Sequence, residues 1–339
     1  MNAEPPLDDA QFATGDVAGY NYHVQLFAGD HEKFPNRVMF TSESTSKDAF
    51  QYWRPVETMP WVIGDFVWTA MDYLGETGIG HSALDNNAKF TMDFPWFNAW
   101  CGDIDLIGGK KAQSYYRDVV WNRSNLEMLV HSPIPDGHKE AVSFWGWPDE
   151  SPSYTFPGAE GKSLQVHVYT RYDSVRLVLN GKTIGVQTAS AQTKLTATFN
   201  ITYEPGVLKA IGFKNGKAVD SVVLKTAGKP AGIRLVADRR NIHTNPNDLS
   251  YVTAEVVDAN GNLIPNAEFL LHFTISGNGK IIATGNANPS GVASMQLPQH
   301  KTFEGKCLAI VQPIGKSGTI ILKATADGLT STQVSIITQ

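Results

Sequence analysis

Residues 38–44 are Val-Met-Phe-Thr-Ser-Glu-Ser, and this stretch decides how the chain is interpreted. It begins with three apolar residues and ends in small polar ones, with one carboxylate, Glu43, near the polar end. A short apolar run of this kind is typical of a strand buried in a parallel sheet. We therefore expect a buried parallel strand that carries Glu43 to its carboxyl end. The alternative is a surface glutamate in the loop after a strand.

The composition narrows the class of protein. The chain has 339 residues, enough for two or three domains. Its formal net charge of −5 gives no indication of nucleic-acid binding. No apolar run approaches the ~20 residues of a membrane span, and the first residues lack the features of a signal peptide. The two cysteines, Cys101 and Cys307, fall in different expected domains, so no disulfide is predicted.

The first part of the chain alternates strands with connections. Residues 1–15 are a polar lead-in, and residues 24–34 predict a short helical link. Residues 47–59 predict an irregular or weakly helical segment, with Pro55 and Pro60 as breakers. Residues 110–122 have the spacing of an amphipathic helix. Three strand candidates end in polar or aromatic groups: residues 16–22, 38–44 and 61–71. This order is typical of the last part of a βα repeat, and in a (β/α)8 barrel the chemistry lies at the carboxyl ends of the strands.

From about residue 123 the pattern becomes all-β. All eight tryptophans lie at or before Trp147. Strands are predicted at residues 125–133 and 141–148. Asn-Gly pairs at 180–181 and 215–216 each separate two apolar runs, which is a strong hairpin signal. We expect three domains: a partial barrel over 1–122, an all-β sandwich over 123–227 and a second sandwich over 228–339.

Several of these stretches resemble a known family, the family 2 glycoside hydrolases, which include β-galactosidases, β-glucuronidases and β-mannosidases. The resemblance to the C-terminal part of the family's catalytic barrel is carried by residues 16–22, 40–44 and 64–76, in that order and spacing. Residues 97–117 are similar to the barrel's end in Bacteroidetes β-galactosidases, and residues 144–161 and 175–185 to the sandwich that follows it. Residues 231–339 resemble an invasin-type bacterial immunoglobulin-like module. The resemblance implies the C-terminal part of a (β/α)8 TIM barrel followed by two immunoglobulin-like sandwiches.

The resemblance also implies roles for five residues. Glu43 would be the nucleophile of a retaining glycosidase, forming a glycosyl-enzyme that water hydrolyses. Tyr22 matches the family tyrosine that donates a hydrogen bond to this carboxylate and helps to keep it ionised. Trp68 matches the tryptophan beneath the sugar. Asp72 and Glu76 are polar candidates for substrate binding at the mouth of the barrel.

A second carboxyl group is the part that we do not find. Retaining hydrolysis needs a general acid/base ~5–5.5 Å from the nucleophile, and in this family it is the Glu of an Asn-Glu pair on an earlier strand. The sequence contains no Asn-Glu, and residues 2–4, Asn-Ala-Glu, are the nearest approximation. We therefore expect the C-terminal part of a larger enzyme, inactive alone, with self-association through the incomplete barrel or poor order in residues 1–122. The family also implies export to the periplasm or cell surface.

Alternatives stay open at this point. The expected partner is a β-galactoside or related glycan, but a β-glucuronidase or β-mannosidase relative and a non-catalytic spacer or glycan-contact module are also considered. No cofactor is indicated: the sequence has no metal-spaced His/Cys cluster, and residues 258–262 fit a hairpin turn better than a calcium loop. A sodium or divalent ion in the full enzyme is left open. Asp65 fits a salt bridge, a loop cap or a binding role, and Trp145 and Trp147 fit core packing or sugar stacking.

Overall fold

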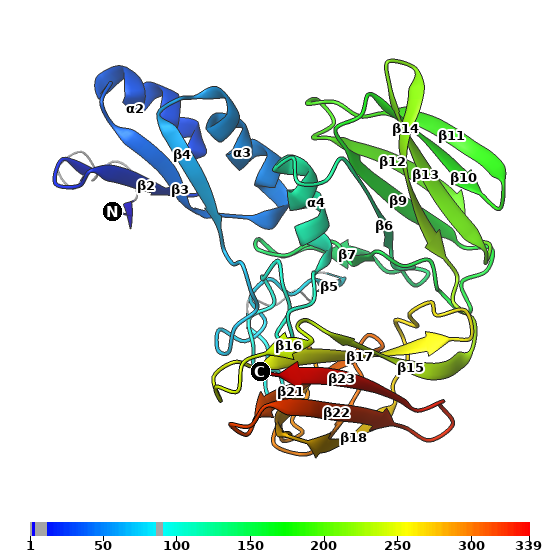
Figure 1. The fold of residues 1–339 in the computed structure, drawn as a ribbon. Coiled ribbons are helices and arrows are strands. Elements are labelled where there is room, and N and C mark those ends of the chain that lie inside the picture. Colours follow the sequence, from blue (N-terminus) through cyan, green and yellow to red (C-terminus); the bar gives the residue numbers. More distant parts are fainter. Residues whose placement is uncertain (1, 4–11, 86–90) are drawn as a thin grey trace. The chain divides into compact units, whose positions relative to one another are not determined.

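The computed structural model describes residues 2–3, 12–85 and 91–339 (Figure 1). The chain divides into two compact units, and each is described by itself. The first unit contains residues 1–93, 97–152 and 158–224, and the second contains residues 94–96, 153–157 and 225–339. The three-domain division expected from the sequence stays a prediction.

The first unit begins with a parallel sheet in the order β1-β2-β3-β4. Its strands are β1 (Asn2–Ala3), β2 (Val17–Asn21), β3 (Val38–Ser44) and β4 (Val62–Val67). The strand predicted at residues 38–44 is confirmed with the same bounds. Residues 2–3, predicted to be a polar lead-in, instead form a strand beside β2, while residues 1 and 4–11 of that lead-in lie outside the described residues.

Helices connect these strands and cover one face of the sheet. The connections are η1 (Val24–Leu26) with α2 (Phe27–Lys33), and η2 (Ser46–Asp48) with α3 (Ala49–Thr58). Of the two alternatives for residues 47–59, the structure shows the helical one, but the prediction that Pro55 breaks it was wrong, because α3 continues through Pro55. Ala49, Tyr52 and Pro55 are buried at a spacing of three residues, so packing of this face outweighs the hydrogen bond that proline removes. One buried core joins helices and strands: Phe12, Ala18, Tyr20, Val24, Phe27, Met39, Tyr52 and Val62.

The helix predicted at residues 110–122 is confirmed as α4 (Ala112–Val120). Its buried side chains pack on α3 and on the first strands of the sandwich that follows, in a cluster of Ala49, Ala112, Tyr116, Val119, Val120, Leu129 and Tyr169. In the part of the chain that the structure describes, no helix has the length and apolar content needed to span a bilayer.

The rest of the first unit is built from two antiparallel four-stranded sheets. One has the order β11-β10-β13-β14, with β10 (Ser174–Leu179), β11 (Lys182–Thr188), β13 (Val207–Lys214) and β14 (Lys217–Lys225). The other has the order β12-β9-β6-β8, with β6 (Leu126–His131), β8 (Glu150–Ser151), β9 (Ser163–Thr170) and β12 (Thr196–Thr202). Both Asn-Gly hairpins are confirmed, and Asn180 and Asn215 adopt positive φ angles of 50° and 51°.

The strand predicted at residues 141–148 was wrong. Only β7 (Glu140–Ala141) is extended, and it pairs with β5 (Ala83–Leu84). The aromatic residues that follow do not alternate between two faces of a sheet, because their side chains pack on the loops beside the parallel sheet, as described below.

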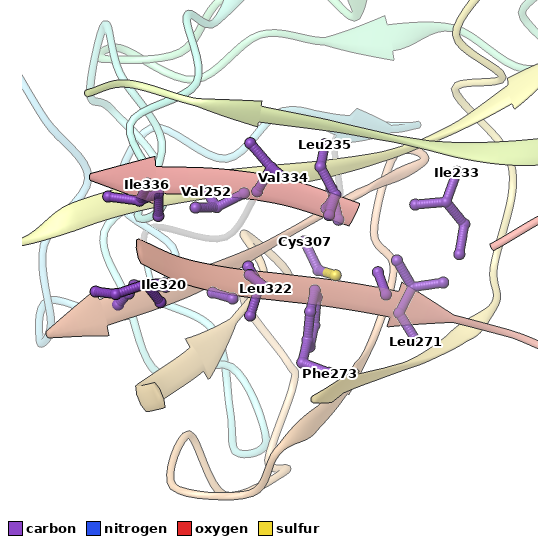
Figure 2. Close-up of a cluster of buried hydrophobic side chains, with 14 of the residues drawn as sticks. Ile233, Leu235, Val252, Leu271, Phe273, Cys307, Ile320, Leu322, Val334 and Ile336 are labelled. Atoms are coloured by element: carbon purple, nitrogen blue, oxygen red, sulfur yellow. The ribbon is translucent and has the colours of Figure 1, made fainter. Parts of the chain in front are cut away.

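The second unit is also two antiparallel-rich sheets. One has the order β15-β17-β21-β19, with β15 (Pro230–Ala237), β17 (Ser250–Asp258), β19 (Gly279–Gly285) and β21 (Lys306–Pro313). The other has the order β16-β23-β22-β18-β20, with β16 (Asn241–Ile242), β18 (Leu270–Gly277), β20 (Gln299–Lys301), β22 (Gly318–Thr325) and β23 (Thr332–Thr338). Figure 2 shows apolar side chains from both sheets filling the space between them, among them Leu322 and Phe273. Cys307 lies in this core, where burial raises the pKa of its thiol to about 12.

Candidate active site

Glu43 follows an irregularity in β3. The pairing with β2 passes from Tyr20 opposite Thr41 to Asn21 opposite Glu43, which leaves Ser42 as an extra residue. The pairing with β4 shifts over the same residues. Such bulges change the direction of side chains and are over-represented beside active sites. Here the bulge is immediately followed by the carboxylate predicted to be the nucleophile.

Tyr22 is held against Glu43 by two hydrogen bonds. Its hydroxyl donates to Glu43 Oε2 over 2.8 Å, and its backbone N–H donates to the Glu43 carbonyl oxygen over 2.9 Å. Tyr22 has a φ of 59°, a left-handed conformation that costs a non-glycine residue roughly 1–2 kcal/mol. Backbone strain of this kind is concentrated at functional sites. The pair lies where β2 and β3 end.

Trp145, from the segment after β7, contacts the other side of the Tyr22 hydroxyl. Its indole Nε1–H donates to Tyr22 Oη over 2.7 Å. The Tyr22 ring also meets Phe144 edge-on, with ring centroids 5.5 Å apart. Burial raises the pKa of Tyr22 well above its usual range; the bond from Trp145 opposes this effect and Glu43 adds to it. Tyr22 therefore remains a protonated donor at neutral pH.

Trp68 lies beside the same strand ends. Its backbone N–H donates to the Ser44 carbonyl oxygen over 2.9 Å, which fixes it next to the end of β3. Its ring meets Tyr73 edge-on, with centroids 6.0 Å apart. Trp68 and Trp145 both pack against one small buried cluster formed by Ile79, Ala99 and Cys101. The structure thus brings Trp68, Tyr22 and Glu43 to one edge of the parallel sheet.

Asp72, predicted to bind substrate, is instead part of a buried ion pair. Its side chain is 0% exposed and lies 3.0 Å from Lys111 Nζ, while the Gly102 backbone N–H donates to it over 2.8 Å. Burial raises the pKa of Asp72 to about 6, and Lys111 opposes that shift. Because its oxygens face these groups and not solvent, Asp72 stabilises the loop from Trp100 to Lys111 and is not placed to contact a ligand.

Glu76 and Asp65 differ in exposure to solvent. Glu76 is exposed and accepts a hydrogen bond from the Tyr73 hydroxyl, so it remains on the Trp68 side of the site. Asp65 is buried 3.5 Å from Arg117 Nη1, and Arg117 also pairs with Asp103. Of the roles left open for Asp65, the structure shows the salt bridge.

The residues predicted to form a turn at 258–262 do so. Asp258 Oδ1 accepts the backbone N–H groups of Asn260 and Asn262, each over 2.9 Å, and Asp258 Oδ2 accepts that of Gly228 over 2.8 Å. Although burial alone would raise it, these bonds lower the pKa of Asp258 to about 2. Among residues 2–3, 12–85 and 91–339, no group of three or more His, Cys, Asp or Glu is arranged to hold a metal ion.

Sequence reasoning missed the contact from Trp145. It left this residue between core packing and sugar stacking, and no local pattern links two residues that lie 123 positions apart. Trp147, two residues on, has the packing role: its ring meets those of Tyr116 and Tyr169.

A half-buried carboxylate held by a phenol and flanked by aromatic rings is suited to nucleophilic attack or to stabilising positive charge.

Two family models match the chain. One, described as the glycoside hydrolase family 2 C-terminal domain 5, matches residues 233–335. The other, described as a domain of unknown function (DUF4982), matches residues 161–220. Together they fall on the two all-β parts of the chain.

Similar proteins extend the match to the parallel sheet. The β-galactosidase BoGH2A of Bacteroides ovatus is 29% identical over 374 aligned residues, which cover 96% of this chain and 40% of that protein. A β-glucuronidase of Formosa agariphila is 26% identical and covers 69% of this chain and 22% of its own length. The crystal structure of a glycosyl hydrolase family 2 member from Bacteroides cellulosilyticus superposes with a TM-score of 0.91 at 36% identity, covering 100% of this chain and 44% of that one. The chain therefore spans less than half the length of these relatives.

Proposed function

Because this chain belongs to glycoside hydrolase family 2, and matches the C-terminal part of its relatives, we propose that it supplies the nucleophile of a retaining exo-β-galactosidase. In this proposal the parallel sheet β1–β4 is part of a (β/α)8 barrel, and the two all-β parts are immunoglobulin-like modules. The observation that carries the proposal is the hydrogen bond from Tyr22 to Glu43 at the carboxyl ends of parallel strands. That edge is where barrel enzymes hold their catalytic groups.

The proposed chemistry starts at the Glu43 carboxylate. One of its oxygens attacks the anomeric carbon of a β-galactoside, a covalent glycosyl-enzyme forms, and the bond to the leaving oxygen breaks as that oxygen takes a proton from a general acid. Water then attacks the anomeric carbon and gives a proton to the same residue acting as base, and the bond to Glu43 breaks to return the carboxylate. The Tyr22 hydroxyl donates to Glu43 Oε2 and fixes the orientation of the carboxylate for attack. Trp68 offers a flat apolar face to the sugar, and Glu76 is the polar group beside it.

The general acid/base is proposed to come from another part of the parent enzyme, because the sequence contains no Asn-Glu pair. Ile63 and Phe66 of the edge strand β4 are each 61% exposed, which suits a surface that pairs with further barrel strands or with a second copy of the chain. The polypeptide alone should therefore hydrolyse aryl β-galactosides whose leaving group needs a proton no faster than its Glu43→Gln variant.

A β-glucuronidase is the second candidate, since two of the curated relatives bear that name, one of them provisionally. The β-galactosidase is preferred because its match covers 96% of this chain against 71% and 69% for the two β-glucuronidases. Two further alternatives are a β-mannosidase relative and a non-catalytic glycan-contact module. The test below distinguishes both from the β-galactosidase. Export to the periplasm or cell surface is proposed from the family alone, and fractionation of the native host tests it.

The test uses 2,4-dinitrophenyl 2-deoxy-2-fluoro glycosides, whose acidic leaving group departs without a general acid. Intact mass spectrometry should show one added fluorogalactosyl group with the galacto probe and slower reaction with the glucuronic and manno probes. Faster reaction with either of those reassigns the sugar. No adduct with any probe contradicts the nucleophile assignment and favours the non-catalytic alternative.

A further inference from the structure

The segment Ser-Phe-Trp-Gly-Trp at residues 143–147, called here the aromatic segment, is fixed tightly beside the parallel sheet. The Ser82 hydroxyl donates to the Trp147 carbonyl oxygen over 3.0 Å, and Lys47 Nζ donates to the Ser143 carbonyl oxygen over 3.3 Å. A Cβ atom at Gly146 would lie 2.8 Å from the Ser82 and Ser143 hydroxyl oxygens. A side chain at position 146 would therefore displace these hydroxyls, and glycine allows the close approach of the backbone next to Trp145.

Within this segment the two tryptophans have different partners. The Trp145 indole N–H meets the Tyr22 hydroxyl at 2.7 Å, whereas the Trp147 indole N–H meets Glu150 Oε2 at 3.3 Å. Phe144 already provides an aromatic contact for the Tyr22 ring. Packing alone would not need an indole N–H aimed at the phenol oxygen. The direction of this donor points to a role in orienting Tyr22.

The Tyr22 hydroxyl has one proton to donate and accepts bonds at its oxygen. Because Trp145 occupies an acceptor position, the proton is directed to Glu43. Donation to the phenol oxygen also polarises the O–H group and strengthens the bond that it makes. We infer that Trp145 is a positioning residue for the nucleophile and acts through Tyr22. The aromatic segment thereby completes the site. This inference rests on the proposed role of Glu43.

The contact can be tested without activity, through the indole resonances of the eight tryptophans in a ¹H–¹⁵N spectrum. Trp145→Phe assigns one resonance and Trp147→Phe another, while the remaining resonances report whether each variant is folded. We expect Tyr22→Phe to move the Trp145 resonance and leave that of Trp147 in place. Glu43→Gln should also move the Trp145 resonance, but not when Tyr22→Phe is already present. A Trp145 resonance that responds to neither change overturns the inference.

The functional arm uses the labelling rate with the galacto probe. Trp145→Phe should slow labelling about threefold to tenfold, as expected for one hydrogen bond, and Trp147→Phe should not. Adding Trp145→Phe to Tyr22→Phe should cause no further loss, because the effect passes through Tyr22. Unchanged labelling in Trp145→Phe, or equal loss in both backgrounds, overturns the inference. If the Trp145 resonance responds to both substitutions while the native chain takes up no label, the proposed function is overturned. The contact between Trp145, Tyr22 and Glu43 would then still be established.

Discussion

Tyr22 and Glu43 are joined twice, once between side chains and once through the backbone. The phenol donates to the carboxylate over 2.8 Å, and the Tyr22 N–H donates to the Glu43 carbonyl oxygen over 2.9 Å. The backbone bond forms with Tyr22 in its left-handed conformation. In this conformation the Tyr22 hydroxyl reaches the carboxylate. The ends of two neighbouring strands are thereby fixed around one acidic group.

Removing the Tyr22 hydroxyl should weaken the nucleophile. The phenol fixes the carboxylate in position for attack, so Tyr22→Phe should slow labelling of Glu43 by the galacto probe roughly 10- to 100-fold through misplacement of the nucleophile. The matched control is Tyr251→Phe, which changes a partly exposed tyrosine of the second unit. Equal labelling rates for Tyr22→Phe and the native chain would count against a role for the phenol.

Arg117 should be essential for the stability of the first unit. Its side chain is 5% exposed and pairs with both Asp65 and Asp103. Arg117→Met leaves two carboxylates buried without their cation, a change that typically costs about 3–5 kcal/mol. Urea denaturation measures the free energy of unfolding, with Arg123→Met as the exposed control. A loss no larger than that of the control would show that the buried pairs contribute little.

The stability of the first unit should fall as pH rises above neutrality. Burial lowers the pKa of His131, but its bonds to Glu140 and the Ser132 carbonyl oxygen outweigh this effect and raise it to about 9. Because the pKa of His131 is higher in the folded than in the unfolded protein, protonated His131 contributes fully to the free energy of unfolding below the unfolded value of 6.5. This contribution is lost as the pH rises through about 9. We expect a loss of roughly 1–3 kcal/mol between pH 6.5 and 9.

Glu140→Gln should flatten this pH dependence, because it removes the carboxylate that accepts from His131 Nε2 at 3.0 Å. Denaturation at a series of pH values measures both proteins. A native chain whose unfolding free energy does not change over this range would contradict the assignment of a charged His131.

The core of the second unit should tolerate truncation poorly. Leu322 is fully buried between the two sheets, so Leu322→Ala should lower the free energy of unfolding by about 2–5 kcal/mol. Val292 is 68% exposed and provides the control variant Val292→Ala. Hydrogen exchange of β17 and β22 follows this unit separately. Similar protection in the two variants would show that the core is less closely packed than described.

Local signals were the most successful sequence predictions. The stretch at residues 38–44, apolar at its start and polar at its end, predicted β3 with the bounds that the structure shows. The Asn-Gly pairs predicted both hairpins. Both patterns depend on neighbouring residues. Pro55 was misjudged because burial of one face of α3 outweighs the local penalty of proline. Burial and packing are tertiary properties that a local pattern does not contain.

The candidate site was only partly predictable for the same reason. The family resemblance placed Tyr22 and Glu43 in one site, and the structure shows them in contact. The residue type and sequence position of Asp72 suggested a binding group. Its ion pair with Lys111 could not be predicted, because Lys111 lies 39 residues away in the sequence. Trp145 joins the site through the close approach at Gly146, which no spacing in the sequence indicates.

The central claim is that one carboxylate, Glu43, forms the covalent bond to sugar. Peptide mapping of the chain after reaction with the galacto probe tests it most directly, with Glu43→Gln and the exposed-site variant Glu32→Gln as a matched pair. We predict one fluorogalactosyl group on the peptide that contains Glu43 in the native chain and in Glu32→Gln, and none in Glu43→Gln. A label on any other residue, or a Glu43→Gln chain that labels as the native one does, would contradict the account.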